Sequence, residues 1–375
     1  MSPQILIVGA GAAGLLAARR LSASGFNVHL IEAAEFAGGR IRTVSISGFP
    51  APVEAGAEFV HGDLPVTVAL AREAGVSLVN THFEQMAVGS QAAGPSYWDE
   101  MMEKMGRLDK DVAVADFLST YFGGEKYEML RRSVRGFAEG YDLADLNSAS
   151  TKALYAEWSS EEGTPGYRPE GGYGRLVDFL VRQCDRLGVA MHFSTPVTEI
   201  HWQEGSVDLV TGGGSNYEGA AVLVTVSLGA LFRLAFKPAI PDYLQAARRI
   251  GYGSVVKILL NFRSAFWRKK KGDETTLFVL SDQPVPTWWT QTGATSTLLT
   301  GWLTGENMRR FLRLDEKGQV DACLASLERI FSLGTGDLRN ELMACYIIDW
   351  GQQPNVYGGY SFETVTTPES RRVLN

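Results

Sequence analysis

Apolar residues near the start of the chain follow two periodicities that indicate different elements. Uninterrupted apolar runs at 5–8 and 28–31 predict buried strands, and the stretch 13–24 between them repeats apolar residues at helical spacing. Arg19 and Arg20 lie on the other side of this helix, so one helical face should pack on a sheet. The chain therefore begins with a predicted strand–helix–strand unit.

The pattern changes after about residue 63. Amphipathic stretches rich in Met, Arg and Glu, such as 66–74 and 112–121, predict a helical insertion that extends to residue 158. Beyond it, the pattern predicts helices at 176–187 and 319–331 and strands at 190–193, 197–202, 207–211, 221–226 and 342–349. The region 257–302 alternates like antiparallel strands, and its basic run at 268–273 is interpreted as a solvated hairpin tip.

Composition narrows the class of protein. The 375 residues are 45% hydrophobic and 21% charged, which is enough apolar surface for a large core and suggests two or more domains. A net charge of -7 argues against nucleic acid or an anionic membrane surface as a partner. No apolar run is long enough to span a membrane, and three scattered cysteines fit neither a disulfide framework nor a zinc site. We therefore expect a soluble, cytoplasmic protein.

The first predicted turn has the sequence GAGAAG, which follows a strand and opens a helix. Gly9 allows the tight turn, Gly11 lets a pyrophosphate approach the backbone, and Gly14 lets helix and strand pack closely. The diphosphate would lie on the free amides of the first helical turn, where Ala13 lies. Glu32 ends the second strand, where it can accept hydrogen bonds from ribose hydroxyls. The alternative is a glycine turn that packs a helix and binds nothing.

A Gly-Gly-Arg turn follows Glu32 shortly afterwards. Gly39 and Arg40 could wrap the diphosphate from a second side, and the guanidinium groups of Arg40 and Arg42 could neutralise it. Alone, this turn is equally well explained as an ordinary surface turn. Together with the first motif it resembles the flavin amine oxidase superfamily, which includes monoamine oxidases, polyamine oxidases, the related histone demethylases and the L-amino-acid oxidases.

The resemblance covers nearly the whole chain and implies an α/β fold with FAD as cofactor. It implies a Rossmann-like, GR2-type FAD-binding domain with an interleaved α+β substrate domain. Val197 occupies the position whose backbone holds the adenine in relatives. The expected FAD-binding domain comprises 1–62, 165–235 and 345–375, and the expected substrate-binding domain comprises 63–164 and 236–344.

The segment VEAGAEFVHG at 53–62 resembles the acidic-Gly-Ala segment of the family, whose backbone passes the flavin ring. The resemblance therefore places Gly56, Ala57 and Glu58 beside the cofactor. Polyamine oxidases similarly end this segment in His-Gly, which implies that His61 lies near the substrate. The alternative for His61 is a purely structural histidine.

Two further segments resemble the family's catalytic positions. The stretch 250–257 looks like the one that delivers the active-site lysine, which in relatives hydrogen-bonds through water to the flavin N5. Lys257 begins an apolar strand, where its charge needs a partner; a lysine that reaches solvent from the strand end is the alternative. The stretch 349–362 resembles the tryptophan-to-tyrosine signature, in which Trp350 contacts the cofactor. Tyr360 would form one wall of an aromatic cage, or else be an ordinary buried tyrosine.

The resemblance implies an oxidase that converts a primary or secondary amine to an imine and then an aldehyde, with oxygen released as hydrogen peroxide. The expected partners are a small-molecule amine and oxygen, and the oligomeric state is left open. Two alternatives are a related flavin desaturase or protoporphyrinogen-type oxidase, and a non-catalytic scaffold. Family members continue into a Phe-Ala-Gly-Glu motif and a final helix, and the 375 residues are expected to lack this segment.

Overall fold

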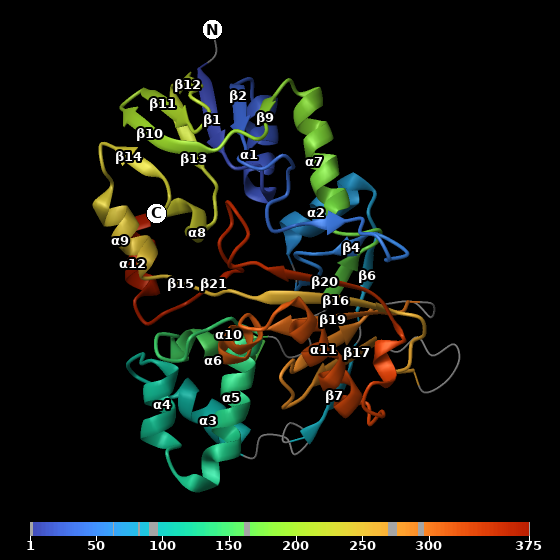
Figure 1. The fold of residues 1–375 in the computed structure, drawn as a ribbon. Helices are drawn as coiled ribbons and strands as arrows, with labels where there is room; N and C mark the ends of the chain where they lie inside the picture. Colours follow the sequence, from blue (N-terminus) through green and yellow to red (C-terminus); the bar gives the residue numbers. More distant parts are fainter. Residues whose placement is uncertain are drawn as a thin grey trace.

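The predicted strand–helix–strand unit is present in the computed structural model of the chain, which describes residues 3–62, 64–81, 83–89, 97–160, 166–268, 276–291 and 296–374. Strands β1 (Gln4–Val8) and β2 (Asn27–Ile31) flank helix α1 (Ala12–Ala23). They form a four-stranded parallel sheet with β9 (Ala190–His192) and β13 (Ala221–Val224), in the order β13-β1-β2-β9 (Figure 1). Parallel strands require crossover connections, which the intervening helices and insertions provide.

Both faces of this parallel sheet are covered. Helix α1 packs with α7 (Gly174–Arg186) on one face, where Ile7, Leu15 and Leu180 are buried together. The other face packs on a second sheet of order β12-β11-β10-β14, which comprises Asn216–Gly219, Ser206–Thr211, Val197–Gln203 and Ala235–Lys237. Burial of both faces explains why the first strands consist of uninterrupted apolar runs rather than alternating ones.

A six-stranded sheet lies between the parallel sheet and a group of helices (Figure 1). Its order is β20-β16-β19-β18-β17-β7, which comprises Leu342–Asp349, Val256–Phe262, Leu298–Leu303, Thr287–Thr290, Thr276–Leu280 and Phe83–Ala87. Its strands pair antiparallel except for β17 with β7, which confirms the antiparallel pattern expected for 257–302. The expected hairpin tip falls largely on residues 269–275, outside the described residues.

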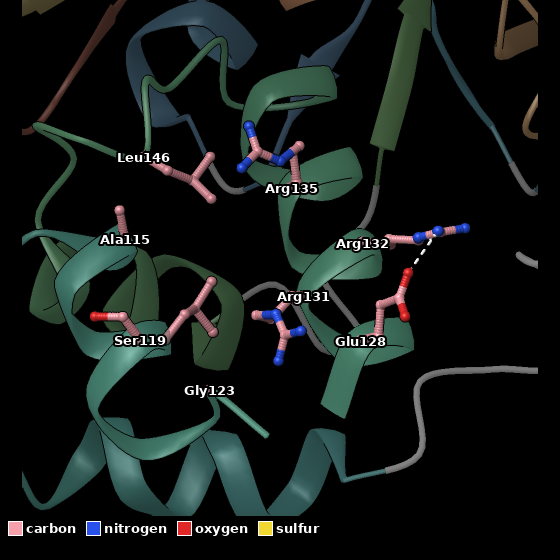
Figure 2. A pocket seen from close by; sticks show the side chains of 9 residues that line it. Ala115, Ser119, Gly123, Glu128, Arg131, Arg132, Arg135 and Leu146 are labelled. Carbon is pink, nitrogen blue, oxygen red and sulfur yellow. Dashed lines mark hydrogen bonds and ion pairs between the residues drawn. The ribbon is translucent and has the colours of Figure 1, made fainter. Parts of the chain in front are cut away.

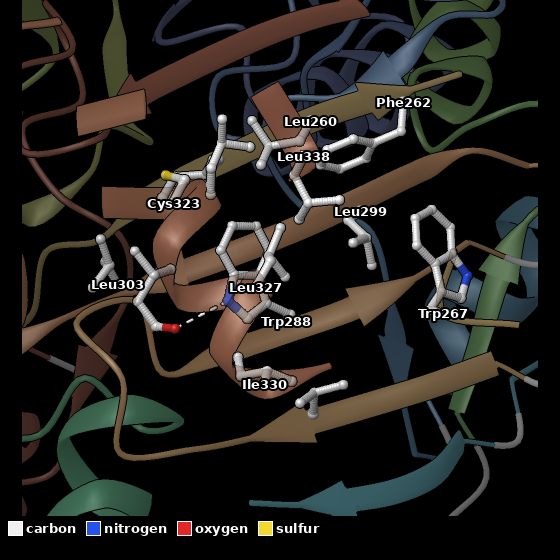
Figure 3. Close-up of a cluster of buried hydrophobic side chains, with 14 of the residues drawn as sticks. Leu260, Phe262, Trp267, Trp288, Leu299, Leu303, Cys323, Leu327, Ile330 and Leu338 are labelled. Carbon is white, nitrogen blue, oxygen red and sulfur yellow. Dashed lines mark hydrogen bonds between the residues drawn. The ribbon is translucent and has the colours of Figure 1, made fainter. Parts of the chain in front are cut away.

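Helix α11 (Glu316–Ile330) covers one face of the six-stranded sheet (Figure 3). Cys323, Leu327 and Ile330 on one side of the helix point at the sheet. Trp288, which is fully buried, lies opposite them and donates its indole N–H to the carbonyl oxygen of Val285 at 3.0 Å. The polar atom of this large side chain is therefore satisfied inside an apolar core.

The expected helical insertion at 63–158 is only partly right. Its helices are α2 (Pro65–Ala74), α3 (Trp98–Gly106), α4 (Val114–Tyr121), α5 (Glu128–Gly140) and α6 (Thr151–Ser160), with a 3-10 turn at Glu125–Tyr127. However, β6 (Leu78–Asn80) and β7 also lie in this region. Strands β5 (Val60–His61) and β6 pair with β8 (Gly166–Pro169), and β7 joins the six-stranded sheet. Strands this short show no period that a sequence pattern could reveal.

The remaining elements are short and connect the larger ones. They are β3 (Thr43–Val44), β4 (Val53–Glu54), β15 (Gly251–Tyr252), β21 (Ser361–Phe362), α8 (Leu228–Leu231), α9 (Pro241–Arg248), α10 (Gly305–Phe311), α12 (Thr367–Leu374) and a 3-10 turn at Asp337–Arg339. No helix among the described residues combines the length and apolarity needed to cross a lipid bilayer. The expected domain boundaries stay a prediction.

The core under α11 should be sensitive to truncation. Leu327→Ala removes a side chain with no exposed surface, and the remaining cavity should lower the free energy of unfolding by about 3 kcal/mol. Leu312→Ala, at a position that is 38% exposed, is the control and should lower the free energy of unfolding far less. Urea unfolding of both variants at neutral pH measures the difference. Equal losses would show that the described packing is wrong.

Candidate cofactor and active site

The glycine-rich turn between β1 and α1 has the geometry that a bound diphosphate requires. Gly9 has a φ of 105°, and a Cβ on Gly14 would lie 1.9 Å from the carbonyl oxygen of Gly9, so both positions require glycine. Gly11 caps α1 without any side-chain hydrogen bond, and a Cβ on it would meet no described atom within 4 Å. The first-turn amides, that of Ala13 among them, have no partner inside the helix. Amides in this place are suited to hold a diphosphate.

Glu32 lies beside this turn, and backbone amides hold its carboxylate. Oε2 accepts from the Ala10 amide at 2.6 Å, and Oε1 accepts from the Ala34 amide at 2.8 Å. Each oxygen has a second lone pair, which is available in principle to a ribose hydroxyl. The predicted adenine contact lies close by, because Val197 follows Thr195, whose amide donates to the Glu32 carbonyl oxygen at 2.8 Å. Both contacts stay predictions.

The Gly-Gly-Arg turn packs on the glycine-rich turn. Gly11 and Gly38 form a parallel bridge, and a Cβ on Gly39 would lie 3.7 Å from the Gly11 Cα. The Arg40 guanidinium donates to the carbonyl oxygen of Gly359 at 2.6 Å. Arg40 therefore ties this turn to the tryptophan-to-tyrosine segment, while its expected contact with a diphosphate stays a prediction.

The acidic-Gly-Ala segment is enclosed on two sides. A Cβ on Gly56 would lie 2.0 Å from the Arg40 carbonyl oxygen and 3.1 Å from Cζ2 of Trp350. The Ala57 amide donates to the same Arg40 oxygen at 2.9 Å, and the buried Trp350 donates its indole N–H to the Ala55 carbonyl oxygen at 3.0 Å. Only a residue without a side chain fits at Gly56, so the backbone can pass closely here.

Lys257 is the second residue of β16 and is only 1% exposed. It pairs with Trp302 on one neighbouring strand and Ile348 on the other, so its side chain extends into the interior. The Nζ donates to the Gly56 carbonyl oxygen and to Oε2 of Glu58, both at 2.9 Å. The alternative of a strand-end lysine that reaches solvent is therefore wrong, because strands on both sides enclose it.

Glu58 accepts four hydrogen bonds from side chains. Oε2 accepts from Lys257 and from Nε1 of Trp289 at 3.1 Å, and Oε1 accepts from Arg168 at 2.8 Å and Gln291 at 2.7 Å. Burial alone would raise the pKa of Glu58, but the charges of Lys257 and Arg168 and the bonds from Lys257 and Gln291 lower it to about 2. Glu58 is therefore ionised at neutral pH, between two buried cations.

Arg168 is held by rings as well as by charge. Its guanidinium carbon lies 4.5 Å from the ring centre of Phe59 and 5.6 Å from that of Phe83, and the side chain is almost fully buried. Glu54, the other carboxyl group in this region, accepts instead from the hydroxyl of Thr43 and the amide of Tyr173. Burial raises the pKa of Glu54.

Aromatic side chains form the outer part of the site. Tyr360 is 37% exposed, and its hydroxyl donates to the carbonyl oxygen of Tyr141. The Tyr141 hydroxyl lies 3.5 Å from Nδ1 of His61, and the two rings meet edge to face. Part of His61 reaches solvent, yet burial of the rest lowers the pKa of its imidazole, so it is neutral at neutral pH. The alternative of a buried Tyr360 is wrong.

The backbone links the aromatic part to the lysine strand. The Gly253 amide donates to the Tyr360 carbonyl oxygen at 3.0 Å, and the Gly359 amide donates to the Gly253 carbonyl oxygen at 2.8 Å. Gly253 lies in the segment that leads into β16. The structure therefore joins Tyr360, His61 and the Lys257 strand, while Glu32 and Val197 are not part of this group of contacts.

Tyr141, Arg168, Trp289 and Gln291 belong to the site although no sequence motif indicates them. The burial of Lys257 in an apolar strand does predict that some partner exists. It does not identify the partner, because Arg168 and Gln291 come from segments far away along the chain. Their positions follow only from strand pairing.

A cavity between two helices of the insertion is separate from this site. It has a volume of about 590 Å³ and lies between α4 and α5, with three arginines on its rim (Figure 2). Arg131 donates to the carbonyl oxygens of Phe122 and Gly124, and Arg132 pairs with Glu128. These guanidinium groups are already engaged by the protein and form no specific ligand site.

The α/β fold, the open glycine turn at the start of α1 and the buried lysine of β16 indicate a nucleotide-dependent oxidoreductase. Residues 12–90 and 84–373 match the family described as flavin containing amine oxidoreductase, and the chain therefore belongs to this family. Membership confirms the expected enzyme class and the flavin cofactor, FAD.

Individual relatives are distant. Lysine-specific histone demethylase 1 homolog 3 of Arabidopsis thaliana is 24% identical over 445 residues, which cover 96% of this chain but 27% of that protein. Polyamine oxidase 2 of the same plant is 24% identical over 411 residues, which cover 98% of this chain and 79% of that protein. A structure of putrescine oxidase bound to putrescine has a TM-score of 0.79 at 22% identity and covers 98% of this chain and 90% of that one. This similarity confirms the α/β fold class.

The two glycines at the helix N-terminus should respond differently to alanine. Gly14→Ala should lower the free energy of unfolding of the FAD-free chain by about 3 kcal/mol, because its Cβ would overlap a carbonyl oxygen. Gly11→Ala should leave that stability unchanged but weaken FAD binding about tenfold or more. Urea unfolding and an FAD fluorescence titration measure the two effects. Normal FAD affinity in Gly11→Ala would contradict the proposed diphosphate position.

Acidification should destabilise the chain through Glu58. The folded-state pKa is below the unfolded value, so the stabilisation is present above about pH 4.5 and is lost as pH falls towards 2. The loss should amount to about 3 kcal/mol and be absent in Glu58→Gln. Glu103→Gln, at an exposed pair with Arg107, should keep the wild-type pH dependence. Chemical unfolding across this pH range tests the expectation, and identical curves for wild type and Glu58→Gln would refute it.

Proposed function

We propose that the chain is an FAD-dependent oxidase that converts a primary or secondary amine to an imine, which water hydrolyses to an aldehyde. The observation that carries the proposal is the buried Lys257 ammonium, held against the Gly56 carbonyl in the segment that lies along the flavin ring in relatives. The names of two similar proteins, polyamine oxidase and putrescine oxidase, favour an aliphatic amine as substrate.

The residues present fit FAD in a Rossmann-type arrangement. The open space at Gly11 and the uncapped start of α1 suit the diphosphate, and Glu32 suits the ribose. At Gly56 the segment packs so closely that a Cβ would overlap the Arg40 carbonyl oxygen, and in relatives the segment of Gly56 and Ala57 lies along the flavin ring. The chemistry supplied by bound FAD is removal of a hydride equivalent from the amine and return of two electrons to oxygen, which leaves as hydrogen peroxide.

The aromatic residues would bind and prepare the amine. The rings of Tyr360 and Tyr141 attract an entering ammonium group through their electron-rich faces. Only a neutral amine has the lone pair that assists C–H cleavage, so a proton must leave first. His61 is neutral at neutral pH and contacts the Tyr141 hydroxyl, so it can accept this proton and pass it to solvent.

The partners that we propose are a small-molecule amine and oxygen. The net charge of -7 disfavours a nucleic acid or an anionic membrane as partner and favours attraction of a cationic amine. Three cysteines without disulfide bonds are typical of a reducing compartment, so we propose a cytoplasmic location.

The FAD-loaded chain should lose its yellow colour when mixed with putrescine in the absence of oxygen. Oxygen should then restore the colour, with one hydrogen peroxide formed per amine oxidised. Stopped-flow absorbance measures the reduction and the reoxidation of the flavin, and a peroxide assay measures the hydrogen peroxide formed. Bleaching that oxygen does not reverse would indicate a dehydrogenase or desaturase, and no bleaching by any aliphatic amine would refute the proposal.

Lys257→Met should slow the reaction of the reduced flavin with oxygen by about two orders of magnitude, because it removes the buried positive charge. Lys317→Met is the matched control, since Lys317 lies on the surface in a helical pair with Asp321. The control should reoxidise at the wild-type rate. Unchanged oxygen kinetics in Lys257→Met would remove the assigned role.

A further inference from the structure

The Lys257 ammonium has three N–H groups, and the protein engages two of them. One is directed at the Gly56 carbonyl oxygen and one at the Glu58 carboxylate, each at 2.9 Å. Both acceptors come from a single chain segment and are two residues apart. They therefore form a pair of acceptors, here called the fork, on one side of the ammonium. The third N–H must point away from both of them because the ammonium is tetrahedral.

We infer that Glu58 is a positioning residue, which together with Gly56 orients the Lys257 ammonium so that its third N–H points towards the ring end of the cofactor site. This inference rests on the function proposed above. It assigns to Glu58 a role different from the backbone contact with the cofactor that the sequence predicts.

Glu58 is itself held in one orientation. Each carboxylate oxygen accepts two side-chain hydrogen bonds, so rotation of the group would break several of them at once. Arg168 packs against the rings of Phe59 and Phe83. Trp289 donates from β18, which pairs with the strand next to β16. A rigid acceptor confines the ammonium far more closely than a water molecule or a mobile side chain would.

The surrounding charges make this pairing specific. The charged groups that face Glu58 are Lys257 on β16, Arg168 on β8 and, more distantly, Glu54 on β4. The Glu54 carboxyl group is directed at Thr43 and the Tyr173 amide instead, so it does not compete for Lys257. Loss of the Glu58 charge would leave two buried cations without a contacting carboxylate, which should destabilise the site.

Three variants separate positioning from simple charge balance. Glu58→Gln keeps the shape but removes the charge, and Glu58→Asp keeps the charge but shortens the side chain, which withdraws the carboxylate from Lys257. Both changes remove the fork. If Glu58 only balanced charge, Glu58→Asp would behave like wild type. Gln319→Met is the control, because it removes a neutral amide donor on helix α11, outside the site, where Gln319 donates to the Leu314 carbonyl oxygen.

The first measurement is reoxidation by oxygen after the flavin has been reduced with dithionite. No amine is involved, so failure of the amine oxidase proposal would not affect the result. Glu58→Gln and Glu58→Asp should each slow reoxidation about tenfold, and Gln319→Met should not. The double variant Glu58→Gln/Lys257→Met should react at the rate of Lys257→Met alone.

The second measurement needs no flavin. Urea unfolding of the FAD-free wild type, Glu58→Gln, Lys257→Met and the double variant gives the coupling between the two side chains. The double variant should lose less stability than the sum of the single losses, because Lys257→Met removes one of the two buried cations that Glu58→Gln leaves without a carboxylate, so that only Arg168 remains. If the Glu58→Gln chain does not fold, Glu58→Asp supplies the same comparison. Additive effects in both measurements, or a wild-type rate in Glu58→Asp, would overturn the inference.

Discussion

The structure depends on one buried ion pair, between the Glu58 carboxylate and the Lys257 ammonium. Removing two charges from water costs several kcal/mol for each ion, by order of magnitude, and the attraction between them repays this only when their remaining hydrogen bonds are satisfied. Here the carboxylate is saturated by Lys257, Arg168, Trp289 and Gln291. The surrounding strands and loops must therefore deliver four side chains to one point.

This requirement explains the interleaving of the chain. The carboxylate comes from the loop after β4, and its partners come from β8, the six-stranded sheet and the residue that follows β18. Further hydrogen bonds hold the same segments together, from Arg40 to the Gly359 carbonyl and from Trp350 to the Ala55 carbonyl. The nucleotide-binding region and the six-stranded sheet thus share one site and cannot form it separately.

Polarity divides the site into two parts with different chemistry. The inner part is ionic and dry, so a fixed positive charge acts there with little screening by water. The outer part is aromatic and partly open, with a neutral His61 between Phe59 and Tyr141. Under the proposed function, an amine that enters as a cation would meet the aromatic rings first, and the buried cation beyond them would favour its neutral, reactive form.

The sequence by itself determined the local elements and the nucleotide-binding end. A tight turn needs glycine at Gly9, close packing needs it at Gly14, and an apolar run makes a buried strand, so these features depend on neighbouring residues alone. The sequence also indicated that Lys257 is unusual. Only the tertiary structure decided that Glu58, Arg168 and Gln291 are its surroundings and that Tyr141 lies between Tyr360 and His61. A charge in an apolar strand requires a partner, but strand pairing between distant segments selects which one.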